Sequence, residues 1–168
     1  ALAVGSVLAG VISLIWASAN YPVFDPWKLF LFTLKFSLPA LAIFLYFAVT
    51  TLAGNSKSHR DILVVGFMAL SGFILLGCGI AGLYNGMGDA SAPTGHTALI
   101  VDKQIHTSKN SKTYKLIVRS WRPERALEDL PTQSGIYYQV VPGKSQALVY
   151  TRYGKLGFEW RVSYRLQN

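Results

Sequence analysis

The sequence predicts an α+β membrane protein, with three transmembrane helices followed by a small antiparallel β-sheet or open-barrel domain. Of its 168 residues, 51% are hydrophobic and 14% are charged, and the mean hydropathy is +0.32. This apolar content exceeds what one soluble core of this length uses. Residues 1–84 hold four Lys or Arg and two Asp or Glu, whereas residues 85–168 hold twelve and six. The chain therefore divides into an apolar half and a polar, basic half.

Three apolar runs in the first half are long enough to cross a bilayer. Residues 1–24 carry no charge, residues 29–53 carry only Lys35, and residues 62–84 carry none. About 20 apolar residues span a hydrocarbon core about 30 Å thick. We therefore expect transmembrane helices at about 1–19, 26–53 and 62–84, a linker at 85–95 and an extramembrane β domain at 96–168.

The boundaries of the first two helices have local signals. Ala17-Ser18-Ala19 resembles a signal-peptidase site. We nevertheless expect a retained helix, with an uncleaved signal anchor as a variant of the same architecture. Asp25 can cap the second helix and Pro26 suits its first position, so this helix is expected to begin there.

Small residues recur along the first and third helices. In the first helix they repeat at intervals of four: Ala1, Gly5, Ala9, Ser13 and Ala17. In the third helix Cys78, Gly82 and Gly86 follow the same interval. Small side chains let helix backbones approach closely in lipid. We expect Gly5, Ala9, Ser13 and Gly82 to contact a partner, and Cys78 to be a small packing residue.

Four cations are candidate contacts for a partner or for lipid. Lys28 and Lys35 lie two turns apart on one face of the second helix. Lys35 can extend back to the interface, or it can pair with a partner's acid or with an anionic lipid. Arg161 and Arg165 alternate with apolar residues near the C-terminus, so their strand would present them on one face.

The loop charges predict an orientation. The segment 54–61 holds Lys57, His59 and Arg60, whereas the segment 20–28 holds one lysine and one acid. The positive-inside rule places the first of these loops in the cytoplasm. In a bacterial inner (cytoplasmic) membrane, the C-terminal domain would then be periplasmic.

The second half has the two-residue period of β-strands. Strand signals occur at 97–105, 113–121, 144–153 and 158–166. In the last of these, the alternating residues Phe158, Trp160, Val162, Tyr164 and Leu166 are expected to form the inner face. The proline-containing segment 122–143 is expected to be an irregular crossover, with a short helix capped by Thr132.

The C-terminal half also resembles uncharacterised bacterial membrane proteins with a small extramembrane β domain. The resemblance covers about residues 96–162. It rests on four short patterns, which are Ala98–Asp102, Tyr114–Val118, Tyr138-x-x-Val141-x-Gly143 and Gly154-x-Leu156-Gly157-x-x-Trp160. It implies the architecture only, because no activity, cofactor or catalytic residue accompanies it.

The sequence contains no recognisable catalytic or metal-binding constellation. Cys78 is the one cysteine, and the three histidines have no paired metal-ligand spacing. Acids at 124, 128 and 129 lie beside Arg122 and Arg125, so local ion pairing is the expected reason for that cluster. We predict no catalytic, cofactor-binding or metal-binding residue, no cofactor and no nucleic-acid partner.

Two hypotheses for function remain. The first is a non-catalytic accessory or scaffold subunit, whose helices pack on a larger membrane complex or on other copies of the chain. The alternative is a module that binds or senses an anionic lipid or another ligand. The first hypothesis uses the small-residue stripes and requires no catalytic group. The alternative uses Lys28, Lys35 and the basic face of the β domain to gather anionic lipid or to relay a signal.

Overall fold

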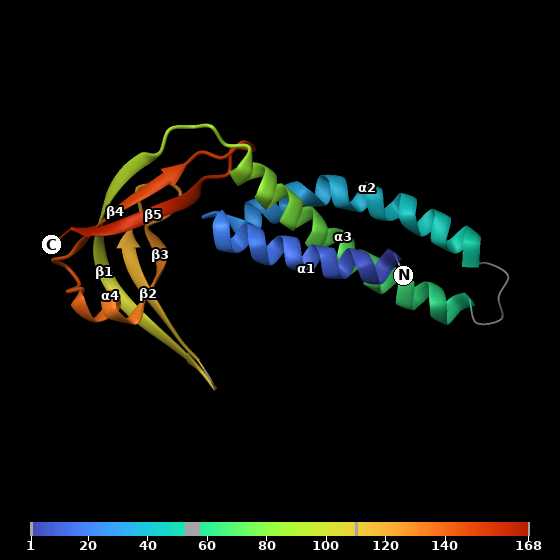
Figure 1. Cartoon of the computed structure of the whole chain (residues 1–168), viewed down its shortest axis with the longest axis horizontal. Helices are drawn as coiled ribbons and strands as arrows, with labels where there is room; N and C mark the ends of the chain where they lie inside the picture. The colour runs from blue at the N-terminus through green and yellow to red at the C-terminus, as the bar shows by residue number, and fades with distance from the viewer. Residues whose placement is uncertain (1, 53–57, 110, 168) are drawn as a thin grey trace. The chain divides into compact units, whose positions relative to one another are not determined.

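The computed structural model describes residues 2–52, 58–109 and 111–167, and it confirms the predicted α+β layout (Figure 1). The helices and strands follow in this order: α1 (Leu2–Asn20), α2 (Pro26–Leu52), α3 (Ser58–Met87), β1 (Thr94–Ser108), β2 (Ser111–Arg119), β3 (Leu127–Thr132), α4 (Ser134–Gln139), β4 (Gln146–Arg152) and β5 (Trp160–Gln167). Two compact units are formed. The helical unit contains the chain up to Ser91 together with Arg152–Trp160, and the β unit contains Ala92–Thr151 together with the chain from Arg161 onward.

The three long helices are apolar and long enough to cross a membrane. The α2 helix begins at Pro26 as predicted, and position 53 lies outside the described residues. The α3 helix begins four residues before the predicted start at 62 and ends three residues after the predicted end at 84. The prediction used the charge-free window, but a helix can extend into polar residues at its ends. Asp61 in the first turn also favours a helix N-terminus.

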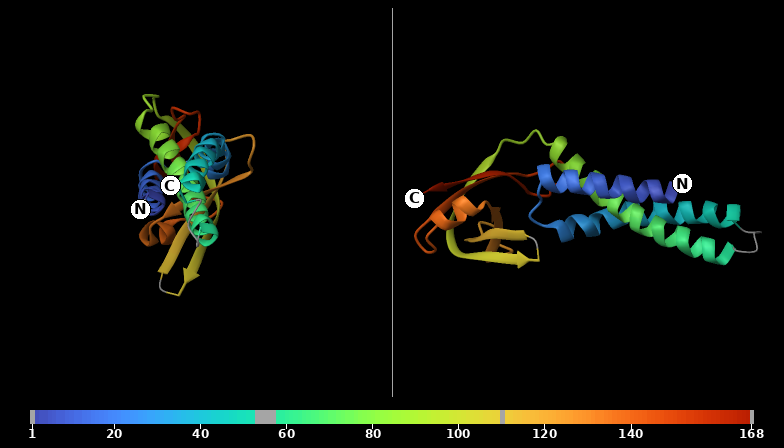
Figure 2. Two further views of the ribbon diagram at one scale, coloured as in Figure 1. Left: turned by 90° about the vertical axis from the view of Figure 1, so that its right-hand side faces the viewer. Right: turned by 60° about the horizontal axis from the view of Figure 1, so that its bottom comes forward.

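α3 packs against both other helices, which lie alongside it in Figures 1 and 2. On α1 the face toward α3 contains Ala3, Ser6, Gly10, Ser13 and Ala17, at alternating steps of three and four. Residues spaced strictly four apart shift by about 40° around the helix at each step, so a stripe of such residues moves off this face. Of the stripe residues that the structure describes, the contact face therefore includes only Ser13 and Ala17.

Glycines on α3 allow the close approach of α1. A Cβ atom at Gly72 would overlap the Ser6 hydroxyl, and one at Gly79 would overlap the Ser13 hydroxyl. Each contact therefore recurs after seven residues on both helices, the repeat of a left-handed supercoil. The Ser13 hydroxyl donates to the carbonyl of Gly10 at 3.0 Å, so its hydrogen bond is made within its own helix.

The α2–α3 contact also uses small residues. The Thr33 hydroxyl lies 3.3 Å from Sγ of Cys78, and Ser37 occupies the space that a side chain at Gly77 would need. Thr33 and Ser37 are buried there. Cys78 is thus placed at a helix contact, as predicted.

The β unit is a five-stranded sheet in the order β3-β2-β1-β4-β5. β1 is long because its first part pairs with β4 and its second part pairs with β2, both antiparallel, with an irregularity between Ile100 and Asp102. Although β3 and β5 are the two edge strands, the hydroxyls of Tyr164 on β5 and Thr132 on β3 are 2.7 Å apart. The sheet therefore curls until its two edges meet through a side chain, as in an open barrel.

The segment predicted as an irregular crossover contains β3, which corrects that part of the prediction. β3 pairs antiparallel with β2, and Leu130 and Glu128 are its buried residues. The sequence of β3 does not show the alternation of apolar and polar residues, because Glu128 occupies an inward position. Pro131 is tolerated because β3 is an edge strand. Thr132 lies in β3 and does not cap α4, whose N-cap is Gln133 without a side-chain hydrogen bond.

The core of the β unit is aliphatic with one tyrosine. Its fully buried side chains include Ile100, Leu116, Val118, Leu130 and Val149. Lys103 of β1 donates to the carbonyls of Tyr137 and Val140 at 3.3 and 3.0 Å, which satisfies carbonyl groups at the end of α4. The short helix is therefore fixed to the sheet by a lysine that the sequence pattern did not single out.

Candidate functional site

Asn85, near the end of α3, is a buried polar residue of the helical unit. Asn85 is 0% exposed. Its amide nitrogen donates to the carbonyl of Phe158 at 2.7 Å, and its amide oxygen accepts from the backbone N–H of Leu156 at 3.0 Å. Its backbone carbonyl accepts from the N–H of Lys155 at 2.9 Å. Asn85 therefore binds the backbone of the loop between β4 and β5.

Asp89 binds the same loop from just beyond α3. Its Oδ2 atom accepts from the N–H of Gly154 at 3.0 Å and from Nε1 of Trp160 at 2.9 Å, and its Oδ1 atom accepts from the N–H of Ser91 at 2.8 Å. Partial burial by itself would raise the pKa of Asp89. The hydrogen bonds from Ser91, Trp160 and Gly154 outweigh burial and lower this pKa from 3.8 to about 2.

The loop needs a glycine where it meets Asn85. Gly154 has a φ of 77°, in the left-handed region. A Cβ atom there would also overlap the Asn85 amide group. Both the backbone conformation and the close approach therefore require glycine at this position.

Trp160 belongs to the helical unit and not to the core of the β unit, which corrects its predicted place. Its ring meets Tyr21 edge to face with centroids 5.2 Å apart, and its backbone forms a bridge with Val23. Trp160 is 6% exposed, but the next residue of the predicted inner face, Val162, is 42% exposed. Strand alternation identified Trp160 as buried, but it could not identify the partner.

The loop and Trp160 therefore contact each of the three long apolar helices at or near one end. Trp160 contacts Tyr21, which follows α1, Phe158 pairs edge to face with Phe32 of α2, and Asn85 of α3 binds the loop backbone. We call this set of contacts the loop anchor. It lies entirely within the helical unit.

A groove of about 470 Å³ runs between α2 and α3. Its walls are aromatic and aliphatic and include Phe36, Phe73 and Ile80, while Tyr84 and Leu156 lie at the end nearest the loop anchor. Phe36 is 65% exposed and Ile80 is 55% exposed, so the groove is open to the surroundings of the helices. No sequence pattern predicted this groove, because its walls come from two helices.

The predicted small-residue contacts separate into two groups. Ser13 and Gly82 pack inside the chain, and a Cβ atom at Gly82 would lie 3.0 Å from Cβ of Ala17. Gly5 and Ala9 are exposed, and a Cβ atom at Gly5 would meet nothing within 4 Å. Only Gly5 and Ala9 therefore remain on an outward surface of this chain.

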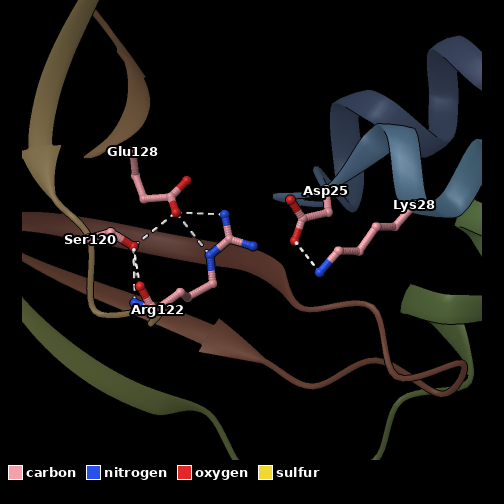
Figure 3. Close-up of polar contacts among 5 residues, drawn as sticks. All are labelled: Asp25, Lys28, Ser120, Arg122 and Glu128. Atoms are coloured by element: carbon pink, nitrogen blue, oxygen red, sulfur yellow. Dashed lines mark hydrogen bonds and ion pairs between the residues drawn. The ribbon is translucent and has the colours of Figure 1, made fainter. Parts of the chain in front are cut away.

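The two lysines of α2 are both exposed. Lys28 lies 4.0 Å from a carboxylate oxygen of Asp25, three residues earlier (Figure 3). Lys35 lies on the same side of α2 as Lys28, as its two-turn spacing requires. The groove lies on a different side of this helix, since Phe36 and Ala40 line it and Lys35 does not.

The arginines of β5 differ in environment. Arg161 is half-buried, and desolvation lowers the pKa of its guanidinium, an effect that Tyr164 partly offsets. Arg165 is exposed. These two side chains therefore do not form one uniform basic surface.

The acidic cluster of the β unit is a structural ion pair. Nη2 of Arg122 lies 2.6 Å from Oε1 of Glu128, and the Ser120 hydroxyl donates to the same oxygen at 3.0 Å (Figure 3). The side chains of Glu128 and Arg122 are 3% and 12% exposed. Lys115 and Asp129 form a second pair, 3.0 Å apart and exposed. Local ion pairing is thus confirmed for this segment.

His96 has an aromatic and a hydroxyl neighbour within the β unit. His96 stacks on Trp121 with ring centroids 4.9 Å apart, and its Nε2 atom lies 3.1 Å from the Thr151 hydroxyl. Within residues 2–52, 58–109 and 111–167, no group of three or more His, Cys, Asp or Glu side chains is placed to hold a metal ion.

Comparison of the chain with models of protein families, with curated proteins and with solved structures finds no match. The resemblance to bacterial membrane proteins with a small β domain therefore stays a prediction. The loop anchor, the groove and the outward helix surfaces are the features that bear on function.

Proposed function

We propose that this protein is a non-catalytic accessory or scaffold subunit of a larger integral-membrane complex. In this proposal its helices pack on partner subunits, and its β domain braces their extramembrane surface. We also propose a bacterial inner-membrane location with a periplasmic C-terminal domain, following the loop charges. The observation that carries the functional proposal is the loop anchor.

The loop anchor supports a bracing role because it fastens strand-connecting backbone to membrane helices. The loop joins the end of β4 to the start of β5, and Asn85 holds it through both the nitrogen and the oxygen of its side-chain amide. A buried amide that is hydrogen-bonded through both atoms favours one arrangement over alternatives. A bracing subunit needs such a fixed loop at the ends of its helices.

The outward surface of α1 supports packing on a partner. Gly5 and Ala9 leave room for another helix backbone, and neither takes part in the α1–α3 contact. Helices associate in lipid mainly where small residues permit close approach. Gly10, by contrast, is already covered by Leu75 of α3.

The test is gentle solubilisation of the tagged full chain, followed by mass measurement of whatever co-purifies. We expect a stoichiometric partner or a homo-oligomer with the wild-type chain. Gly5→Leu with Ala9→Leu should release the partner while the chain stays inserted and folded, because bulk at a close crossing separates the two backbones. Ala42→Leu, at an exposed position of α2, is the matched control and should keep the partner.

Gly10→Leu separates loss of a partner from loss of the fold. A side chain at this position would meet Leu75, so this variant should loosen the chain's own α1–α3 contact and lower its melting temperature. A monomeric wild-type chain with its own turnover, abolished by one histidine or carboxylate substitution, would contradict the proposal.

A further inference from the structure

The length of the groove between α2 and α3 matches one leaflet of a bilayer. On α3 its lining runs from Tyr84 to Phe73, and on α2 from Phe32 to Ala40. At 1.5 Å per residue these segments are about 16 and 12 Å long. Half of a hydrocarbon core about 30 Å thick is about 15 Å. The lining of the groove therefore has about the length of one leaflet.

This length favours an acyl chain over a transmembrane helix as the occupant. A partner helix crosses both leaflets and would need a complementary surface along the whole of α2 and α3. The floor of the groove is already closed, because Ser37 fills the space beside Gly77. Its volume of about 470 Å³ lies within the range of about 300–1,000 Å³ typical of small-molecule pockets.

A lysine lies next to two lining residues of the groove, Tyr84 and Leu156. Lys155 precedes the lining residue Leu156, and its backbone N–H is held by the carbonyl of Asn85, next to the lining residue Tyr84. Its side chain runs along Gly88, where a Cβ atom would lie 3.3 Å from Cδ of Lys155. Lys155 is exposed, and it makes no ion pair with any side chain in the described ranges.

Asp89, the residue after Gly88, accepts hydrogen bonds from other donors. Both carboxylate oxygens of Asp89 accept hydrogen bonds, from Ser91, Gly154 and Trp160. Arg152 adds a second cation to the same loop, and its Nη1 atom donates to the backbone carbonyl of Asp89 at 3.4 Å. Asp89 is therefore held by donors other than Lys155, and the ammonium group of Lys155 remains to meet another anion.

We propose that this groove binds one acyl chain of an anionic phospholipid, with the phosphate-bearing headgroup at Lys155. The apolar walls contribute burial of the chain, and Lys155 contributes selectivity for negative charge. This site differs from the lipid contacts expected from the sequence at Lys28 and Lys35, which lie on another side of α2. It requires no partner subunit, so it stands or fails separately from the accessory role.

The test titrates the purified full chain with phosphatidylglycerol and with phosphatidylcholine of the same acyl chains, and counts bound lipids by native mass spectrometry. We expect phosphatidylglycerol to bind preferentially. Lys155→Gln should lower phosphatidylglycerol occupancy about fivefold and leave phosphatidylcholine unchanged, as expected for one interfacial cation. Lys144→Gln, an exposed lysine of the β unit, is the matched control and should change neither.

A second pair of variants tests the groove itself. Ala81→Leu fills the lining from α3 and should lower the occupancy of both lipids, whereas Ala42→Leu, outside the lining, should lower neither. If Ala81→Leu does not fold, Ala40→Leu fills the same groove from α2. Equal wild-type binding of the two lipids, or unchanged phosphatidylglycerol occupancy in a folded groove-filling variant, would overturn the proposal. The proposal would also be overturned if a groove-filling variant lost a bound polypeptide and not a bound lipid.

Discussion

Asn85 and Asp89 lie one helical turn apart in sequence, and together they hold the β4–β5 loop. Asn85 binds the loop through a neutral amide, so its contribution is independent of pH. Asp89 binds it through a carboxylate with a pKa of about 2, below the usual 3.8. The two residues therefore divide the loop anchor into a part that is insensitive to acid and a part that acid weakens.

Acid should destabilise the wild-type chain through Asp89. Because its pKa is lower in the folded state, its stabilising contribution is complete above pH 3.8 and is lost as the pH falls toward about 2. We expect a loss of about 1–2 kcal/mol over this interval. The measurement is thermal unfolding in detergent, followed by tryptophan fluorescence.

Asp89→Asn provides the control for this prediction. It should lower the stability at neutral pH and show a smaller pH dependence between 4 and 2 than the wild type. Trp160→Phe keeps an aromatic ring beside Tyr21 but removes one donor to Asp89, so its acid transition should shift toward higher pH. Identical acid profiles for the wild type and Asp89→Asn would show that another group is responsible.

At the scale of elements, the edge strand β3 depends on a buried charge pair. Glu128 points inward beside Leu130, and Arg122 and Ser120 satisfy its carboxylate. Charge pairs of this kind stabilise little compared with an apolar pair, but removal of one partner leaves the other charge buried without compensation. The pair therefore specifies how β3 joins the sheet.

Glu128→Ala should therefore destabilise the β unit by about 3–5 kcal/mol, which is large for a domain of this size. Asp129→Ala, the next residue and half of an exposed pair, should cost less than about 1 kcal/mol. Replacement of both Arg122 and Glu128 by Met should recover most of the loss. Thermal melting of the full chain, followed by circular dichroism, measures all three. Equal effects of the two single substitutions would contradict the assignment of the buried pair.

At the scale of the whole molecule, the open question is which side of the membrane each end of α3 faces. The prediction relies on Lys57, which lies outside the described residues, and on Arg60, which is 3.8 Å from Asp61. Partial neutralisation of Arg60 weakens the local charge difference but does not remove it. The loop before α3 is still expected on the cytoplasmic side.

Cysteine labelling in intact cells tests this orientation. In a chain in which Cys78 is replaced, Ser111→Cys in the β unit should react with an impermeant maleimide, and Ser58→Cys should react only after the cells are permeabilised. Labelling of both positions after permeabilisation controls for accessibility. The opposite pattern would place the β unit in the cytoplasm, and the lipid groove would then open to the inner leaflet.

The sequence by itself determined the elements that a single local period specifies. A bilayer requires about 20 apolar residues for a helix, and a sheet imposes a period of two on its strands, so hydropathy was enough to place α1, α2, α3 and four strands. It also identified Trp160 as buried and Cys78 as a packing residue.

Tertiary structure alone decided which side chains meet. The seven-residue recurrence of the α1–α3 contact, the hold of Asn85 on a loop about 70 residues later in the chain, and the groove between α2 and α3 all join distant segments. β3 was missed because a glutamate satisfied by Arg122 occupies an inward position, and burial of a charge depends on a partner that no periodicity reveals.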